Sequence, residues 1–369
     1  MDDRSGRPYF TTADAELTRR IGIINLHDDF PIAIAKRRFD GVYDSLRTYW
    51  LPQFRAGGVG AVVAAIFTPS VYVPEGALRH ALWLLDGLLT EIDENHDDIA
   101  LAFSSTDVRR LNAEGKVAVL LAVEGAEPLG NDLAVLRLLH RLGLRMLSVT
   151  WARRTAFGVG NWEHDAPGGL TRLGVRAVEE MNRLGIIVDV SHASDRTTAD
   201  ILAASTKPVI ASHANARALR DHPRNLTDEV IRAIAARGGV VGAVAVADFI
   251  DAGEPSIAKW VDHLEHLIEI AGIDHVAIGA DFYRHQREIN AAQGIAEADG
   301  APFPGTARFV FPGMENSEDL PGLTAELARR GMGEEDLRKI YRDNFLRVMS
   351  AVVDERGGRA ALDRAPGVH

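Results

Sequence analysis

Eight short segments that are almost continuously apolar recur along the chain, and this recurrence restricts the fold more than any other feature. Continuous apolar character, without alternation, is typical of strands covered on both faces in a parallel sheet. The sequence therefore predicts eight buried strands. They are expected at residues 21–25, 60–67, 116–125, 144–151, 185–192, 208–213, 238–246 and 275–282.

Amphipathic segments with helical periodicity separate most of these strands. In one, apolar residues recur at helical spacing and Gly185 marks the end; they are Leu173, Val175, Val178 and Met181. In another, Thr227 is the expected N-cap and Gly238 follows the helix. Eight strand–helix units predict a (β/α)8 TIM barrel of the α/β class. A doubly wound open sheet is the rival, but no glycine-rich nucleotide loop follows the first strand.

The whole chain, 1–369, is interpreted as one barrel domain. The long interval from 67 to 116 is expected to hold more than one helix. After the eighth strand, residues 283–313 are rich in Gly, Pro and Ala and are interpreted as an enlarged loop over the active-site end of the barrel.

Composition narrows the chemistry and the partners. The 369 residues include no cysteine, so disulfides and thiolate metal sites are excluded and any metal must be held by His, Asp and Glu. The net charge of −11 disfavours nucleic acid and anionic membranes as partners. No secretory signal and no apolar run of about 18 residues is visible, so we expect no transmembrane helix and a cytoplasmic location.

Polar residues stand where several predicted strands end. In a barrel of this class, the carboxyl ends of the strands meet at one rim, where the chemistry is built. Five strand ends therefore supply candidate ligands or proton carriers to a single site. These candidates are His27, Asp29, Glu124, His192, His213 and Asp281.

Three imidazoles with carboxylates and no thiol suit Zn²⁺ or a similar divalent ion. The number of donors favours two metals and a bridging water acidified to a nucleophile. Glu124 is the candidate bridge; the pair after the first strand would hold one ion and the two later histidines the other. Asp281 would then move protons. Singly, each residue has a plainer interpretation, such as a core histidine, a turn carboxylate or a helix N-cap.

Other polar residues have different expected roles. His263 and His266 lie three apart on a predicted helix among apolar neighbours, which indicates packing or surface roles. His275 precedes the eighth strand and is expected at the opposite, stabilising end of the barrel. Arg224 follows the sixth strand, where its guanidinium would suit bidentate binding of a substrate carboxylate, although a surface ion pair is the alternative.

These motifs resemble the membrane (renal) dipeptidase family of zinc metallopeptidases over nearly the whole chain. The block from "DVSH" through "ASH" to "HPRN" is the most specific part. "LHDDFP" is similar to the family's "GHNDLP", "AVEGAE" to its "IEG", and "AGIDHVAIGADF" to its last barrel strand.

The resemblance implies a (β/α)8 barrel whose binuclear zinc centre hydrolyses dipeptides, and a homodimer. It implies that Glu124 bridges the metals, that Arg224 binds the substrate's terminal carboxylate, and that Asp281 transfers protons. The metal ligands that it implies are His27, Asp29, Glu124, His192 and His213.

Two departures from the family pattern bear on the substrate. Where the family has "LTLTHN", this chain has "LSVTWARR", so Trp151 replaces a substrate-contacting histidine. An indole donates a hydrogen bond but carries no charge, and losing a positioned donor can cost about 2.7–4 kcal/mol of transition-state stabilisation. Arg153 or Arg154 would compensate for the lost positive charge; the alternative is that either one is only a surface charge. "DFDG" becomes "DFYR", so Tyr283 and the 283–313 insertion are expected to reshape the pocket.

Three functions remain open from the sequence. The first is hydrolysis of dipeptides or similar small carboxylate-bearing amides by a zinc-bridging hydroxide. The second is a specialised lactam or amide hydrolase, or a tailoring enzyme, on the same binuclear centre. The third is a barrel that binds without catalysis. Zinc is the expected metal, with cobalt or manganese as alternatives.

Overall fold

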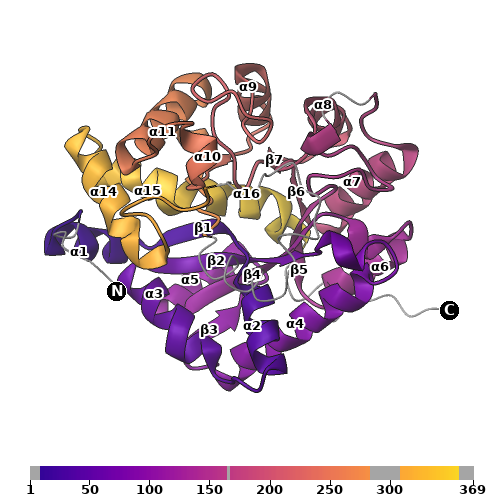
Figure 1. Ribbon diagram of the computed structural model, residues 1–369, viewed down its shortest axis with the longest axis horizontal. Coiled ribbons are helices and arrows are strands. Elements are labelled where there is room, and N and C mark those ends of the chain that lie inside the picture. The colour runs from indigo at the N-terminus through magenta and orange to yellow at the C-terminus, as the bar shows by residue number, and fades with distance from the viewer. Residues whose placement is uncertain (1–8, 164–166, 283–307, 357–369) are drawn as a thin grey trace.

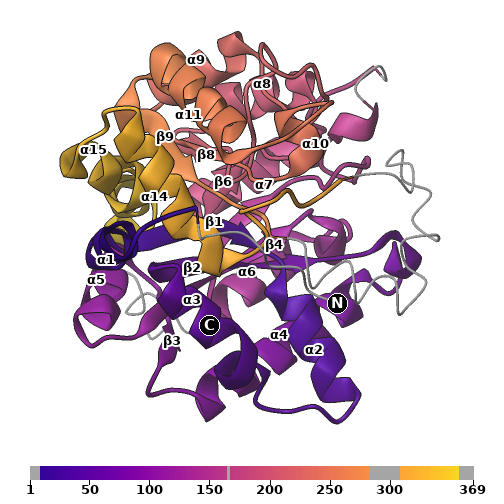
Figure 2. The same ribbon diagram turned by 60° about the vertical axis from the view of Figure 1, so that its left-hand side comes forward.

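Eight parallel strands form the barrel predicted from the sequence. The computed structural model describes residues 9–163, 167–282 and 308–356. The strands follow one another around the ring in the order β7-β6-β5-β4-β2-β1-β9-β8. A bridge between Ala211 and Val241 joins the two ends. Most of these strands are labelled in Figure 1, and β8 and β9 in Figure 2. The ring strands are β1 (Ile23–Asp28), β2 (Val59–Phe67), β4 (Val117–Glu124), β5 (Leu144–Ser148), β6 (Ile187–Asp189), β7 (Val209–Ile210), β8 (Val241–Ala243) and β9 (Val276–Ile278).

A ninth strand, β3 (Ile99–Leu101), was not predicted. It lies outside the ring and pairs only with β4. Three residues are too few to show a periodic pattern, and the strand exists because it pairs with a neighbouring backbone. The interval that contains it also holds two helices, as expected.

Helices surround the strands in Figure 1 and also lie outside them in the view turned by 60° (Figure 2). Their ends follow local signals: Thr171 and Thr227 cap their helices through hydrogen bonds from Gly174 N and Val230 N, and Gly185 ends its helix in the left-handed conformation. The α-helices are α1 (Thr12–Ile21), α2 (Phe30–Phe39), α3 (Leu51–Ala56), α4 (Ala77–Glu94), α5 (Ser105–Ala113), α6 (Leu133–Arg141), α7 (Arg172–Leu184), α8 (Asp195–Ala204), α9 (Asp228–Ala236), α10 (Ala247–Ile250), α11 (Ile257–Ala271), α14 (Leu320–Arg329), α15 (Glu334–Arg338) and α16 (Asn344–Val352). Short π-helical or 3-10 segments are η1 (Leu46–Trp50), η2 (Ser70–Tyr72), η3 (Glu127–Leu129), η4 (Asn161–Glu163), η5 (Ile273–His275), η6 (Ser317–Asp319), η7 (Lys339–Asp343) and η8 (Asp354–Arg356).

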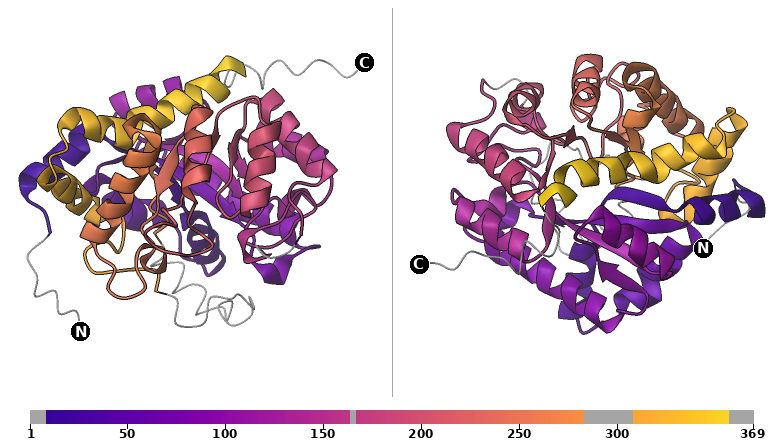
Figure 3. Two further views of the ribbon diagram at one scale, coloured as in Figure 1. Left: turned by 90° about the horizontal axis from the view of Figure 1, so that it is seen from above. Right: turned by 180° about the vertical axis from the view of Figure 1, so that it is seen from behind.

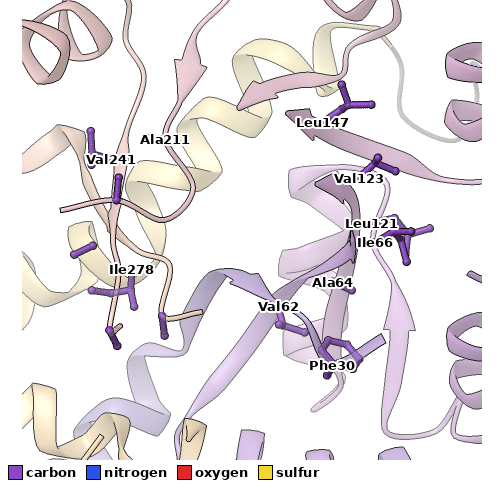
Figure 4. Packing of buried hydrophobic residues seen from close by; sticks show 14 of the residues in the cluster. Phe30, Val62, Ala64, Ile66, Leu121, Val123, Leu147, Ala211, Val241 and Ile278 are labelled. Carbon is purple, nitrogen blue, oxygen red and sulfur yellow. The ribbon is translucent and has the colours of Figure 1, made fainter. Parts of the chain in front are cut away.

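Strand side chains divide between two apolar clusters. Val62, Ala64 and Ile66 of β2, with Leu121 and Val123 of β4, belong to the outer cluster between the strands and the helices (Figure 4). The residues between them face the barrel interior, because successive strand side chains point to opposite faces. Both faces are buried, which explains why these strands read as continuous apolar runs.

Helix α16 closes the amino-terminal end of the barrel. Its residues Phe345 and Met349 belong to the inner cluster with Ile24 and Ala118. The Asn344 side chain donates hydrogen bonds to backbone carbonyls at the start of β9. Seen from behind, α16 runs across the barrel (Figure 3). The interior is therefore a packed core, and the opposite end is left for chemistry.

Three further expectations concern a membrane-spanning helix, the 283–313 insertion and the number of domains. No helix among the described residues combines the length and apolar character needed to cross a bilayer. Most of the 283–313 insertion lies outside the described residues. Where the chain is described again, Arg308 forms an ion pair of 3.1 Å with Asp248 of α10. The assignment of 1–369 to one domain stays a prediction.

Candidate metal centre

The six candidate residues from the strand ends lie together at the carboxyl-terminal end of the barrel, and all have buried or nearly buried side chains. Glu124 Oε1 is the common neighbour. It lies 2.8 Å from His192 Nε2, 3.4 Å from His213 Nε2 and 3.5 Å from His27 Nε2. A second group lies around His27 Nε2, with Asp29 Oδ1 at 3.6 Å and Asp281 Oδ1 at 3.8 Å.

Glu124 faces the interior because of its position in β4. Ala118, Leu120 and Ala122 point into the barrel, and Glu124 continues this alternation at the last residue of the strand. The next residue, Gly125, has φ +85°, and a Cβ there would lie 2.9 Å from Trp151 N. Glycine thus lets the chain turn away directly after the carboxylate.

His27 and Asp29 come together at the turn that leaves the first strand. In a regular strand, alternation would place both side chains on one side, but β1 ends at Asp28, and Asp29 is the N-cap of α2. The pairing of β1 with β2 also shifts register between Asn25 and Asp28. The turn from strand to helix, and not a regular strand, brings the two side chains together.

Two of the clustered residues have strained backbones. His192 has φ +69° and Asp281 has φ +55°, the left-handed region that costs a residue with a Cβ about 1–2 kcal/mol. The surroundings hold both conformations: Asn161 N donates to His192 O at 2.7 Å and Asp281 N to His27 O at 3.2 Å. Such strain is common where side chains must be aimed at a site.

The cluster contains more negative charge than its own cations balance. Burial raises the pKa of Glu124 well above its usual range, and Asp29 and Asp281 add to the shift. Burial also raises the pKa of Asp281 to about 6, although His27 and Arg224 oppose this. For His27, burial lowers the pKa, but the neighbouring carboxylates outweigh it and raise the pKa to about 10. A divalent cation would stabilise the ionised carboxylates.

The donor atoms also fit a cation by spacing. Nitrogen ligands at about 2.0–2.1 Å from a tetrahedral zinc ion lie about 3.4 Å from one another. His192 Nε2 lies 3.0 Å from His213 Nε2, and both are 2.8–3.4 Å from Glu124 Oε1. Two groups whose donor atoms all lie within 4.8 Å of one another are His27–Glu124–His213 and His27–Asp29–Asp281.

Arg224 is buried beside this cluster and is not a surface ion pair. Only 2% of the residue is exposed, and its Nη2 donates to His213 O at 3.1 Å. Its Nε has no hydrogen-bond partner in the part of the chain that the structure describes. Burial lowers its pKa, while Asp281 and Glu124 oppose the shift. A guanidinium with a free donor near the cluster can bind an anionic group.

Trp151 lies in an aromatic wall next to His192. Its ring centroid is 5.7 Å from that of His192, 4.8 Å from that of Phe67 and 4.4 Å from that of Trp162. The wall carries no charge of its own. Tyr283, the other residue expected to shape the pocket, lies outside the described residues.

The two arginines after Trp151 have different environments. Arg154 is on the surface and pairs with Glu163 at 3.0 Å. Arg153 is half-buried over the Trp151 ring, with its Cζ 4.6 Å from the centroid, and forms an ion pair of 3.1 Å with Glu127. Burial raises the pKa of Glu127 to about 7, although Arg153 opposes the shift.

The sequence patterns gave no role to Glu127 or to Asp28. Asp28 is buried, and its burial, together with Asp29, raises its pKa to about 8. The position of Asp28 between the candidate ligands His27 and Asp29 was the sequence signal that could have drawn attention to it. Three histidines that the sequence analysis placed outside the site have other partners: His263 contacts Ile250 O, His266 pairs with Asp228, and His275 contacts Gly239 O.

An eight-stranded parallel barrel with imidazoles and carboxylates converging at its carboxyl-terminal rim defines a TIM-barrel protein of the metallohydrolase type. The model of the family described as membrane dipeptidase (peptidase family M19) matches residues 12–297 and 298–358. The chain belongs to this family of metallopeptidases.

Individual relatives agree with this assignment. The chain is 31% identical to the dipeptidase verJ of Clonostachys rogersoniana over 370 residues, which covers 95% of this chain and 88% of the relative. A metallopeptidase from Rhodobacter sphaeroides, solved with a phosphinate mimic of the dipeptide L-Ala-D-Ala, is 28% identical with a TM-score of 0.78, covering 90% of this chain and 99% of that one. The solved structure of dipeptidase AC, a metallopeptidase of family M19, is 29% identical with a TM-score of 0.78, covering 90% of this chain and 98% of that one.

Proposed function

We propose that the protein hydrolyses the amide bond of dipeptides, or of similar small amides that carry a carboxylate, with metal ions held at the rim of the barrel. The observation that carries this proposal is the convergence of three imidazoles on one oxygen of Glu124. Membership in a dipeptidase family supports it, as does the relative that was solved with a mimic of L-Ala-D-Ala.

We assign the metal ligands to two sets that share Glu124. His27 and Asp29 would hold one ion, and His192 and His213 the other, with zinc as the expected metal. Nitrogen and carboxylate donors with no thiolate match the preferences of zinc. Bound there, the metal pair would polarise the substrate carbonyl and lower the pKa of water.

Asp281 is the proposed proton carrier of the reaction. Its pKa of about 6 lies close to neutrality, so it can accept a proton from attacking water and return it to the leaving amine. It lies 3.8 Å from His27 Nε2 and therefore beside the proposed metal ligands. Asp281 also belongs, with His27 and Asp29, to a group whose donor atoms could hold a metal ion.

Arg224 is the proposed binder of the substrate's carboxylate. Its guanidinium is fixed by the His213 carbonyl and by burial, so little rotational freedom is lost when an anion binds. The unpartnered Nε supplies a donor for that anion. A substrate without a free carboxylate is therefore expected to be poor.

A second candidate function follows from the aromatic wall. Trp151 and Phe67 offer flat apolar surface beside His192, and Arg153 is held by Glu127 instead of pointing freely at the site. Such a wall suits a lactam or another bulky amide better than a small polar dipeptide. The two candidates share the metal centre and differ only in substrate.

One experiment separates these functions from a non-catalytic barrel. Zinc is measured in the purified protein and in Glu124→Gln, with Glu229→Gln as a control on the surface of α9. The proteins are then screened with dipeptides and with lactams. Two zinc ions, loss of metal in Glu124→Gln and turnover of dipeptides would support the proposal; firmly bound zinc with lactam turnover alone would favour the second. Protein that binds no zinc, or that binds zinc but turns over neither class of substrate, would refute both.

Three companion predictions depend on the resemblance or on the sequence. A homodimer is expected, and sedimentation velocity measures it. A cytoplasmic location is expected, and fractionation of the source cells tests it. Limited proteolysis tests whether 1–369 is one domain.

A further inference from the structure

A buried chain of hydrogen bonds leads from Asp189 to His213. Ser212 Oγ lies 2.5 Å from Asp189 Oδ2 and 2.7 Å from His213 Nδ1. None of the three residues is more than 4% exposed. Asp189 is the last residue of β6, and the other two follow β7, so the chain spans two neighbouring strands of the barrel.

The direction of each hydrogen bond follows from the donors present. Ser191 N and Ser212 N both donate to Asp189 Oδ1 at 2.9 Å, so the carboxylate of Asp189 is the acceptor in both bonds. A carboxylate oxygen accepts and the serine hydroxyl donates, so the single hydroxyl hydrogen of Ser212 points to Asp189 Oδ2. Ser212 Oγ is then left as an acceptor for His213, whose Nδ1 must carry the hydrogen.

This assignment leaves a lone pair on the other nitrogen of His213. Nε2 faces Glu124 Oε1 at 3.4 Å and His192 Nε2 at 3.0 Å, where a cation is proposed to bind. His213 is therefore in the tautomer that a metal ligand needs before any metal arrives. A second contact holds the backbone, because His213 N donates to Ser191 Oγ at 3.1 Å.

His192 lacks this arrangement and provides an internal comparison. Its Nδ1 is buried and has no hydrogen-bond partner among residues 9–163, 167–282 and 308–356. Its position depends on the strained backbone and on the hydrogen bond from Asn161 N. His192 Nε2 faces two acceptors, Glu124 Oε1 at 2.8 Å and the lone pair of His213 Nε2 at 3.0 Å, so we place its hydrogen on Nε2 in the metal-free protein.

We infer that Asp189 and Ser212 are positioning residues that fix the Nδ1–H tautomer and the ring orientation of His213, whereas His192 must change tautomer when metal binds. The importance of this for catalysis rests on the proposed function, but the tautomer does not. Groups that orient a ligand in this way typically contribute about 10–100-fold to metal affinity.

Nitrogen NMR of histidine-labelled protein reads the tautomers directly, with His213→Gln and His192→Gln assigning the signals. In the metal-free wild type, we expect His213 as Nδ1–H and His192 as Nε2–H. Added zinc should change His192 and leave His213 as it is. A wild-type His213 with its hydrogen on Nε2 overturns the inference without any variant.

Variants test whether the chain of hydrogen bonds from Asp189 through Ser212 fixes the tautomer of His213. Ser212→Ala is expected to mix the tautomers of His213 and to weaken zinc binding about 10–100-fold, measured by competition with a chromophoric chelator. Ser212→Thr, which keeps the hydroxyl, should restore both. Ser205→Ala removes another buried serine hydroxyl, one that contacts Asn182 and the Lys207 carbonyl, and should change neither.

The results separate the inference from the proposed function. If Ser212→Ala and Asp189→Asn keep the His213 tautomer and bind zinc within twofold of wild type, the chain of hydrogen bonds does not position the His213 ring. If the wild type binds no zinc but shows the expected tautomers in the metal-free state, the inference holds and the proposed function fails.

Discussion

Replacing Arg224 by alanine tests how the proposed site selects its substrates. The guanidinium is 2% exposed and donates to the His213 carbonyl, and its Nε has no partner among the described residues. A substrate carboxylate would complete its hydrogen bonding. Arg224→Ala should therefore lower kcat/KM for a dipeptide far more than kcat/KM for the same dipeptide with its C-terminus amidated.

The size of the effect follows from charge-assisted hydrogen bonds. Each is worth about 1.5–3 kcal/mol, and two bonds from one guanidinium are not additive, so we expect a loss of about 3–4 kcal/mol. Each 1.36 kcal/mol is tenfold in rate, which gives a decrease of about 10²–10³ in kcat/KM for the dipeptide. The amide, which lacks the charge, should lose much less.

A ratio of substrates removes the effects that are not specific to the carboxylate. Arg224 also lowers the pKa of Asp281 and of Glu124, so its removal raises both values whatever the substrate. These changes cancel when kcat/KM for the dipeptide is divided by that for the amide. The ratio is expected to fall by about 100-fold, and Arg224→Lys, which keeps the charge without the planar fork, should lie between.

Arg217 provides the matched control. It lies in the same segment, forms an ion pair of 2.6 Å with Asp195 and donates from Nε to Asn225 O at 2.8 Å. Arg217→Ala should leave the ratio unchanged. If Arg224→Ala reduces hydrolysis of the dipeptide and of the amide by the same factor, the carboxylate clamp is wrong.

Three further predictions concern other parts of the protein. Trp151→His should raise kcat/KM for small dipeptides by about 10²-fold, because it restores a donor that can carry charge; a decrease would mean that the aromatic wall itself binds the substrate. Chelation of metal should abolish hydrolysis and lower the unfolding temperature, with both restored by zinc, because a ligand that binds only the folded state stabilises it; a chelated protein of unchanged stability would contradict this. Burial lowers the pKa of His80 to about 4; the unfolded chain protonates first, near pH 6.5, so the stability present above that pH is lost as pH falls towards 4. His80→Gln should therefore reduce the dependence of urea unfolding on pH in that window, and an unchanged slope would show that folding does not lower the pKa of His80.

The sequence predicted the barrel because its signals are local and repeated. Continuous apolar runs identify strands buried on both faces, and capping residues such as Thr227 limit the helices between them. It missed β3, which consists of three residues and depends on pairing with β4. Closure of the ring through Ala211 and Val241 involves backbone pairing that no residue type indicates.

The candidate site was visible in the sequence for a topological reason. Parallel strands all end at the same rim, so polar residues at several strand ends must come close together whatever the loops do. For this reason His27, Glu124, His192 and His213 could be grouped from the sequence alone. Their metal-binding roles stay predictions until ligand variants are assayed for metal.

Contacts between separate segments were decided only by the tertiary structure. Asp29 meets His27 through the turn into α2, Arg153 pairs with Glu127 over the Trp151 ring, and Asp189 reaches His213 through Ser212. Sequence patterns record which way a side chain points from its own strand or helix. They do not record which hydroxyl or carboxylate a neighbouring element places within hydrogen-bond distance, because that depends on the packing of the whole barrel.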